Sequence, residues 1–249
     1  YFWRLAGSYP VESPSLINSN PTTPLAPAVL PERRLLDGVL AAPEAKDPPV
    51  AAVIIDNMAE SRPPAALSRA FLVIEAPVEA NITRFLAFYS LDQDIEKIGP
   101  IRSLRPYFLS WAEGTADILA HVGGSPEALS QARVSPLYNL DEFAHTASFW
   151  RDQNRSAPHN VYTSTARLLE ALLAYQKGGA QGVSYASWPY SEEIPQNAIP
   201  ALEIIIPAQD LAYSARWQYR DVLKQYERVM AGQSHRDENG IVIQASNVI

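Results

Sequence analysis

The most restrictive feature of the sequence is a short run of apolar residues, Ala51–Ile55, that ends abruptly at Asp56 and Asn57. A run of this length without a polar residue predicts a strand that is buried on both faces. Similar apolar or strand-forming runs predict further strands at residues 71–75, 83–89 and 117–122.

Helical patterns lie between and after these predicted strands. Apolar residues recur at helical spacing over residues 107–112 and again over 168–173. The second stripe follows a Thr-Ser-Thr sequence at 163–165, which is suited to cap a helix, and two glycines at 178–179 would stop it. Strands that alternate with helices predict an α/β domain, a mixed sheet with flanking helices, over residues 50–182.

The segments around this domain differ in composition. Nine prolines between Tyr9 and Pro49 predict that residues 1–49 form an extended, membrane-proximal tether with one short helix at 32–40, because proline lacks an amide donor and restricts its predecessor. Residues 183–200 are predicted to be a linker. Residues 201–249 are predicted to begin a β-rich, truncated second domain, with strands at 202–206, 212–219, 225–230 and 241–244.

Charge and cysteine content exclude several classes of function. Lys and Arg total 20 against 27 Asp and Glu, which gives a formal charge of −7. A chain this acidic is a poor general binder of nucleic acid, so an anion site must be a local cluster of arginines. The sequence has no cysteine, which excludes disulfides, thiolate metal sites and cysteine nucleophiles within it. It also lacks the familiar zinc-hydrolase, phosphate-loop, dinucleotide and serine-hydrolase motifs, and we expect no metal and no cofactor.

Three segments concentrate groups that bind anions. In the first, Arg102, Ser103 and Arg105 precede Pro106, and Ser103 is suited to cap the helix that follows. Arginine offers a planar fork that matches phosphate or carboxylate. The alternative is that both arginines pair inside the fold. We expect one of each, with Arg105 facing the crevice and Arg102 more deeply paired. Their candidate acidic partners are Asp56, Glu75 and Glu79.

The second segment is a glycine turn. Gly123 and Gly124 follow the strand that ends near His121, and Ser125 is suited to cap the next helix. Glycines let backbone amides approach a ligand, and a helix start favours anions. An ordinary tight turn beside a buried histidine is the alternative.

The third segment is a loop rich in polar and aromatic residues, for which a hydrogen-bonded loop clasp is the alternative. With Arg84, its side chains complete the predicted ligand-binding set: Arg151, Arg155, His159 and Asn160.

Several stretches resemble one known family. "VIIDNMAESRPPAALSRAFLVIEAPVEANITRFLAFY", "IGPIRSLRPYF", "AHVGGSPEAL" and "FWRDQNRSAPHNVYTS" are similar to blocks of the bacterial YerB-like lipoprotein family, a conserved domain of unknown function. The resemblance covers residues 50–180 and extends more weakly over the C-terminal segment. It implies an exported protein anchored on the outer side of the cytoplasmic membrane. The family usually has two glycines where this chain has Ala80 and Asn81.

The leading hypothesis is an extracytoplasmic, membrane-anchored protein that binds an anionic envelope ligand or a protein partner in a crevice lined by arginines and histidines. One alternative is a phosphoryl-transfer or hydrolytic envelope enzyme, in which Asp56 or Glu75 would hold a cation; the arginine-bearing turn has a distant analogy to the LytR–CpsA–Psr envelope phosphotransferases. The other alternative is a structural subunit of an envelope assembly.

The first prediction concerns anchoring. Tyr1–Arg4 is aromatic with one basic residue, which suits either the interfacial end of a membrane segment upstream of residue 1 or a packed terminus. We expect the full-length protein to partition with membranes on cell fractionation, and a chain that begins at Pro49 to be soluble and folded. Recovery of the full-length protein in the soluble cytosolic fraction would contradict the anchoring.

Overall fold

The computed structural model describes residues 2–5, 32–34, 36–41, 47–178 and 201–249. Its α-helices are α1 (Pro106–Ala112), α2 (Pro126–Ala132) and α3 (Thr165–Lys177). The strands of its N-terminal half are β1 (Phe2–Leu5), β2 (Glu32–Arg33), β3 (Leu40–Ala41), β4 (Val50–Asp56), β5 (Leu72–Pro77), β6 (Thr83–Ser90) and β7 (Ile118–His121). The remaining strands are β8 (Tyr138–Asp141), β9 (Trp150–Arg151), β10 (Val161–Tyr162), β11 (Glu203–Ile206), β12 (Ala215–Arg220), β13 (Gln225–Met230), β14 (Gln233–Ser234) and β15 (Gln244–Val248).

Strand β4 is apolar throughout because the sheet is covered on both faces. Ile54 packs in the core on one face, and its neighbours Val53 and Ile55 pack in the core on the other, as the twofold alternation of a strand requires. Strand β4 pairs antiparallel with β6 and parallel with β7, and β7 pairs parallel with β8. The mixed sheet predicted from the alternating pattern is confirmed.

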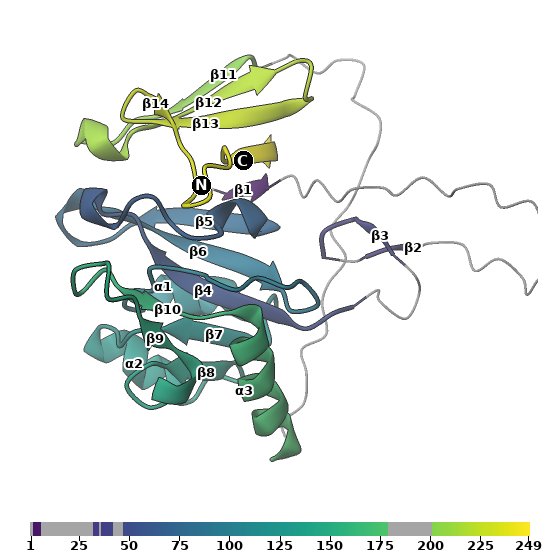
Figure 1. Cartoon of the computed structure of the whole chain (residues 1–249), viewed down its shortest axis with the longest axis vertical. Helices are drawn as coiled ribbons and strands as arrows, with labels where there is room; N and C mark the ends of the chain where they lie inside the picture. The colour runs from purple at the N-terminus through teal and green to yellow at the C-terminus, as the bar shows by residue number, and fades with distance from the viewer. Residues whose placement is uncertain (1, 6–31, 35, 42–46, 179–200) are drawn as a thin grey trace, which may run out of the picture.

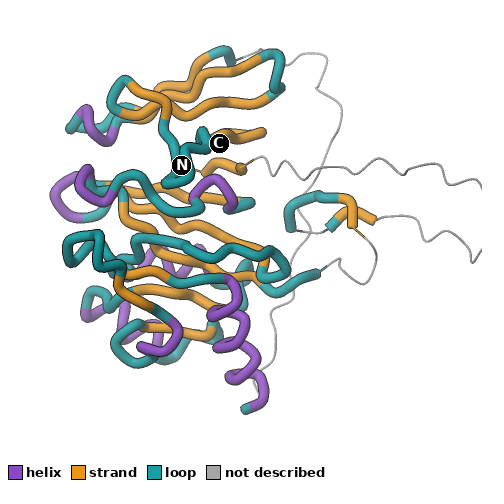
Figure 2. The backbone as a smooth tube through the Cα atoms, viewed as in Figure 1, coloured by secondary structure: helices purple, strands orange, loops and turns teal. Residues whose placement is uncertain are grey.

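The helices cover opposite faces of this mixed part. Helix α1 packs Phe108 and Leu109 against one face together with α2, and α3 packs Leu168 and Leu172 against the other. Ser125 caps α2 by accepting a hydrogen bond from the amide of Ala128 at 3.2 Å. All three described α-helices lie beside β4, β7 and β8, in the lower part of Figures 1 and 2.

A second, antiparallel part continues the same sheet. The strand order is β11-β12-β13-β15-β1-β5-β6-β4-β7-β8, and Figure 1 shows these strands stacked from top to bottom. The predicted β-rich second domain is confirmed as antiparallel strands. Its boundaries stay a prediction, because the sheet runs through β1 without a break and the expected linker lies outside the described residues.

The N-terminal segment differs from the predicted tether. The helix expected at residues 32–40 is wrong: β2 and β3 form a small antiparallel pair there. Between them Leu36 is buried in the core, and Arg34 donates hydrogen bonds to Ser90 and Asp92 at 2.7 and 2.9 Å. This segment therefore packs on the domain, and residues 6–31 of the expected tether lie outside the described residues.

Strand β1 occupies a central place in the sheet. It pairs antiparallel with β5 on one side and with β15 on the other. This is the packed alternative for the aromatic start, and it argues against independent folding of a chain that begins at Pro49, which would leave β5 and β15 without their shared neighbour. Within the described residues, none of the helices combines the length and apolar character needed to cross a bilayer.

Three local predictions are wrong at the strand and helix ends. Ser103 does not cap α1, which begins at Pro106 with Arg105 in the capping position. The last strand is residues 244–248 in place of 241–244, and β12 starts at Ala215 in place of Ala212, where a 3₁₀ turn intervenes. Strand β8, whose half-buried polar residues Asn139 and Asp141 break the apolar pattern, was not predicted.

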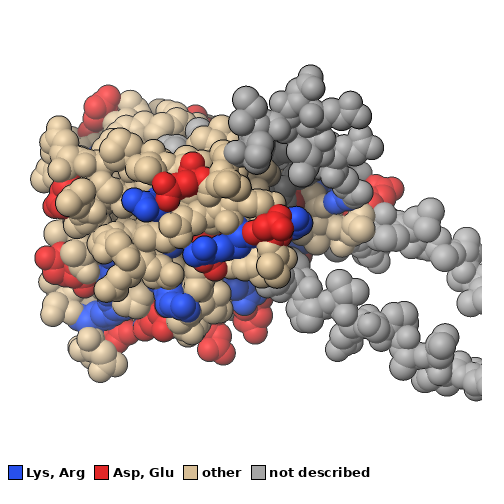
Figure 3. All heavy atoms as spheres, turned by 90° about the horizontal axis from the view of Figure 1, so that it is seen from above, with Lys and Arg blue, Asp and Glu red and all other residues tan. Residues whose placement is uncertain are grey.

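Paired charges cover the β11 end of the sheet. Arg216 lies 3.2 Å from Glu203, and Arg220 lies 2.6 Å from Glu227. Figure 3, which looks onto this end, shows basic and acidic residues next to one another among the described residues of this face.

A buried ion pair joins the two parts of the sheet. Glu75 of β5 and Arg228 of β13 are both completely buried, with Oε2 2.5 Å from Nη2. The second oxygen of Glu75 accepts hydrogen bonds from Thr83 and Asn57, and Arg228 also contacts His235 Nδ1 at 2.6 Å. Glu75 therefore serves the junction between the two parts and does not pair with Arg102 or Arg105.

The turn between β5 and β6 contains two residues with left-handed backbone conformation. Ala80 and Asn81 have φ of 56° and 59°, a region that favours glycine because a Cβ atom is crowded there. This conformation explains the two glycines expected in the YerB-like family at these positions. The turn also carries Glu79, whose place matters for the candidate site.

A glycine at position 80 should stabilise the protein. We expect Ala80→Gly to raise the free energy of unfolding by about 0.5–1 kcal/mol, because relief of the left-handed strain exceeds the entropy that glycine loses on folding. Ala174→Gly, at an exposed position inside α3, is the matched control and should lower it by about 1 kcal/mol. Urea unfolding measures both, and changes of the same sign would contradict the explanation.

Candidate functional site

The predicted loop segments meet at the end of β4. The backbone of Ile101 bridges Ile55, and its amide donates to the carbonyl of Val161 at 2.8 Å. Leu104 donates to the carbonyl of Gly123 at 2.9 Å. Backbone pairing therefore brings the segments around Arg102, the glycine turn and the loop before β10 side by side, although they are far apart in sequence.

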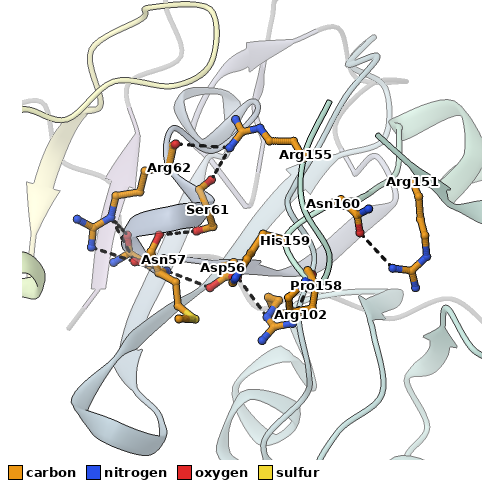
Figure 4. A network of polar contacts seen from close by, with 11 residues as sticks. Asp56, Asn57, Ser61, Arg62, Arg102, Arg151, Arg155, Pro158, His159 and Asn160 are labelled. Carbon is orange, nitrogen blue, oxygen red and sulfur yellow. Dashed lines mark hydrogen bonds and ion pairs between the residues drawn. The ribbon is translucent and has the colours of Figure 1, made fainter. Parts of the chain in front are cut away.

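Three arginines and two carboxylates form what we call the arginine cluster: Arg84, Arg102, Arg105, Asp56 and Glu79. Asp56, at the end of β4, is 1% exposed. Its Oδ1 accepts a hydrogen bond from the amide of Met58, and its Oδ2 lies 3.2 Å from Arg102 Nε and 2.6 Å from His159 Nδ1. Figure 4 shows the side chains of Arg102 and His159 meeting at this carboxylate.

Arg105 is paired differently. Its guanidinium donates two hydrogen bonds of 2.6 Å to the carboxylate of the exposed Glu79. This contact lowers the pKa of Glu79 to about 2. The pair therefore contributes to stability above the ordinary glutamate pKa of 4.5 and is lost as the pH falls toward 2. Of the two arginines, Arg102 has the buried partner and Arg105 has the solvent-exposed one.

Arg84 is the arginine of the cluster whose positive charge is least offset by neighbouring carboxylates. It is 7% exposed, and one nitrogen donates to the carbonyl of Ser103 at 2.9 Å. Its Nε is buried with no hydrogen-bond partner, and no described carboxylate forms an ion pair with it. Burial, followed by the charges of Arg105 and Arg102, lowers the pKa of Arg84 to about 10. The guanidinium is still charged at neutral pH, and a bound anion would stabilise this charge.

His159 presents one free ring nitrogen. Because Nδ1 faces the buried carboxylate of Asp56, it is the protonated nitrogen of the ring. Nε2 has no hydrogen-bond partner among the described residues, and it is not one of the buried unpartnered atoms. It is therefore open to solvent beside Arg102, where it can accept or donate a proton.

The glycine turn supports the cluster through its backbone. Gly123 has φ of 58°, and a Cβ there would lie 2.9 Å from the ring of Phe143. His121 is completely buried, with Nδ1 2.8 Å from the carbonyl of Gly123 and Nε2 2.5 Å from Asn139 Oδ1. Both nitrogens of His121 are thus used internally, and the described contacts make this histidine a brace for the turn. Gly124 packs against Leu104, and Ser125 caps α2.

The remaining predicted residues brace loops. Arg155 donates to the carbonyls of Ser61 and Pro63 at 3.1 and 3.0 Å, and Arg151 joins Asn160 to Glu142. Figure 4 shows the Arg151–Asn160 contact to one side of the Asp56 centre. These contacts correspond to the loop clasp that was the alternative for this segment.

The two carboxylates that the enzyme hypothesis assigned to a metal cation are paired with basic side chains of the protein. Asp56 lies against Arg102 and His159, and Glu75 lies against Arg228. Across the described ranges, no group of three or more histidine or carboxylate side chains is arranged to hold a metal ion. Arg228 itself was not predicted, because it stands 153 residues from Glu75 and no local pattern connects them.

A comparison with models of known protein families shows to which family the chain belongs. The model described as "Protein of unknown function (DUF3048) N-terminal domain" matches residues 36–179. The chain belongs to this family. The match includes every residue of the arginine cluster, together with His159. The resemblance to the YerB-like family is confirmed.

The relatives agree with this assignment. The chain is 40% identical over 128 residues to "Putative lipoprotein YerB" of Bacillus subtilis (strain 168), which covers 51% of this chain and 38% of that protein. The chain thus matches less than half the length of this relative. The crystal structure of the YerB protein from Bacillus subtilis superposes with a TM-score of 0.74 at 27% identity, covering 85% of this chain and 71% of that one.

The two paired arginines should differ in their contribution to stability. Arg102→Ala leaves the buried Asp56 with less compensation and should cost about 1–3 kcal/mol, whereas Arg105→Ala releases the exposed Glu79 and should cost less than about 1 kcal/mol. Chemical denaturation of both variants measures the difference. Equal losses would contradict the pairing described above.

Proposed function

We propose that the chain is an extracytoplasmic, membrane-anchored protein that binds an anionic ligand of the cell envelope at the arginine cluster. Arg84 carries the proposal, because it is a buried cation that has no ion-pair partner among the described residues. A buried charge without a counterion is destabilising, and a ligand that supplied the missing charge would offset that cost.

The surroundings of Arg84 support the same ligand class. The three arginines and two carboxylates of the arginine cluster have a net charge of +1. The whole chain, in contrast, has a formal charge of −7. Guanidinium groups bind phosphate and carboxylate in a planar, charge-assisted geometry. The name of the relative, "Putative lipoprotein YerB", supports membrane anchoring, and an anchored protein would lie in the cell envelope.

The pairing of Asp56 and Glu79 is relevant to the alternative that the protein has a purely structural role. Asp56 and Glu79 neutralise Arg102 and Arg105, as a purely structural role would require. Arg84 departs from that pattern, and the open Nε2 of His159, which shares Asp56 with Arg102, adds a second group that a ligand could reach. An acidic segment of a partner protein would meet the same donors, and it is the outcome to distinguish if small anions fail to bind.

Thermal unfolding with and without pyrophosphate tests the proposal. At a ligand concentration ten times Kd, binding stabilises by about 1.4 kcal/mol, which corresponds to a rise in Tm of about 3–6 °C for a chain of this size. Arg84→Met should abolish this rise and keep or raise the Tm of the free protein, because it removes an uncompensated buried charge.

Arg220→Met, which alters an exposed arginine on β12 paired with Glu227, is the matched control and should keep the ligand-dependent rise. The proposal is wrong if the parent protein shows no rise, or if Arg84→Met shows the same rise as the parent.

A further inference from the structure

The contact between Asp56 and His159 gives the arginine cluster a group that can change its charge. Within the arginine cluster, Asp56 contacts two cationic or ionisable side chains, Arg102 and His159, through the same oxygen, Oδ2. With neutral His159 the three arginines and two carboxylates leave one positive charge. When His159 gains a proton at Nε2, the same groups leave two.

We propose that the ligand is a doubly charged phosphate group, such as a phosphate monoester, and that His159 takes up one proton at Nε2 when this group binds. The inference rests on the proposed function, since it concerns the same arginine cluster. It adds the class of anion and assigns His159 as the residue that adjusts the charge of the site to that of the ligand.

The geometry supports this role for His159 more than for the other histidines. Asp56 Oδ2 accepts a hydrogen bond from Nδ1 of His159 at 2.6 Å and would stabilise the imidazolium that forms. His121 uses both ring nitrogens internally. Burial and the charge of Arg228 lower the pKa of His235 well below the ordinary value, so it stays neutral. His145 packs edge-on against Tyr138, outside the described contacts of Asp56.

The charged groups around His159 come from its own loop and from three other parts of the chain. Asp56 approaches from the end of β4 and favours the protonated ring, while Arg102, from the segment after Ile101, opposes it. Arg84 on β6 interacts with both of these side chains. Arg155, in the same loop as His159, is directed to backbone carbonyls of residues 61–63. A dianion next to Arg102 and Arg84 would offset the repulsion that the arginines exert on the protonated ring.

Isothermal titration calorimetry at pH 7.5 tests the proposal on the whole chain. Methyl phosphate, which is mainly a dianion at this pH because its second pKa lies near 6, is titrated in two buffers with different ionisation enthalpies. The dependence of the measured enthalpy on the buffer gives the number of protons taken up. We expect an uptake that approaches one proton for methyl phosphate and a clearly smaller uptake for dimethyl phosphate, a monoanion.

His159→Asn retains an N–H donor toward Asp56 but cannot take up a proton. This variant should bind methyl phosphate about tenfold or more weakly, the loss expected for one charge-assisted contact, and its proton uptake should fall close to zero. His145→Gln is the matched control and should behave like the parent protein.

The outcomes separate this inference from the proposed function. If no phosphate compound binds the parent protein, the proposed function fails. If methyl phosphate binds but the parent takes up no proton, or if His159→Asn takes up as many protons as the parent, the role of His159 is overturned while the anion site stands. The comparison of the two phosphate esters uses the parent protein alone, so it remains decisive if His159→Asn fails to fold.

Discussion

The buried ion pair between Glu75 and Arg228 is the contact on which the rest of the structure depends. Both side chains are fully excluded from solvent, so each charge is tolerated only while the other is present; loss of one partner of such a pair typically costs about 3–5 kcal/mol. Thr83 and Asn57 also donate hydrogen bonds to Glu75. Because Arg62 donates to both oxygens of Asn57, this polar network reaches from β13 to the residues that directly follow Asp56. The position of the arginine cluster is thus connected to the packing of the antiparallel strands.

The arginine cluster shows how a fold can hold excess positive charge within an acidic protein. Asp56 is at the end of β4 and Glu79 is in the turn after β5, and the arginines come from β6 and the segment before α1. Burial and mutual repulsion make Arg84 the most strained of the three cations. The backbone pairing of Ile101 and Leu104 with neighbouring segments fixes the arginines in place, so their repulsion cannot be relieved by movement of the segment as a whole.

The sequence predicted elements whose pattern is local and failed where distant contacts decide. Strand β4 and helix α3 were predicted because their apolar spacing and flanking residues are continuous in sequence. Ser103 was assigned wrongly as a helix cap, since the residues on either side of it are hydrogen-bonded to the glycine turn and hold it outside the helix. The pair of Arg102 and Asp56 was among the predicted pairings. The pair of Arg228 and Glu75 depends on where β13 lies relative to β5, and no pattern in the sequence near either residue indicates it.

The position of β1 has a consequence for how the chain reaches its native state. Trp3 pairs with Val248, so this contact closes a loop of nearly the whole chain. Closing a flexible loop of that length costs about 5 kcal/mol in chain entropy, more than the hydrogen bonds of a four-residue strand return. The pairing therefore becomes favourable only after folding within each half has shortened the effective loop. We therefore expect β1, the first described element in the sequence, to pair with β15 late in folding.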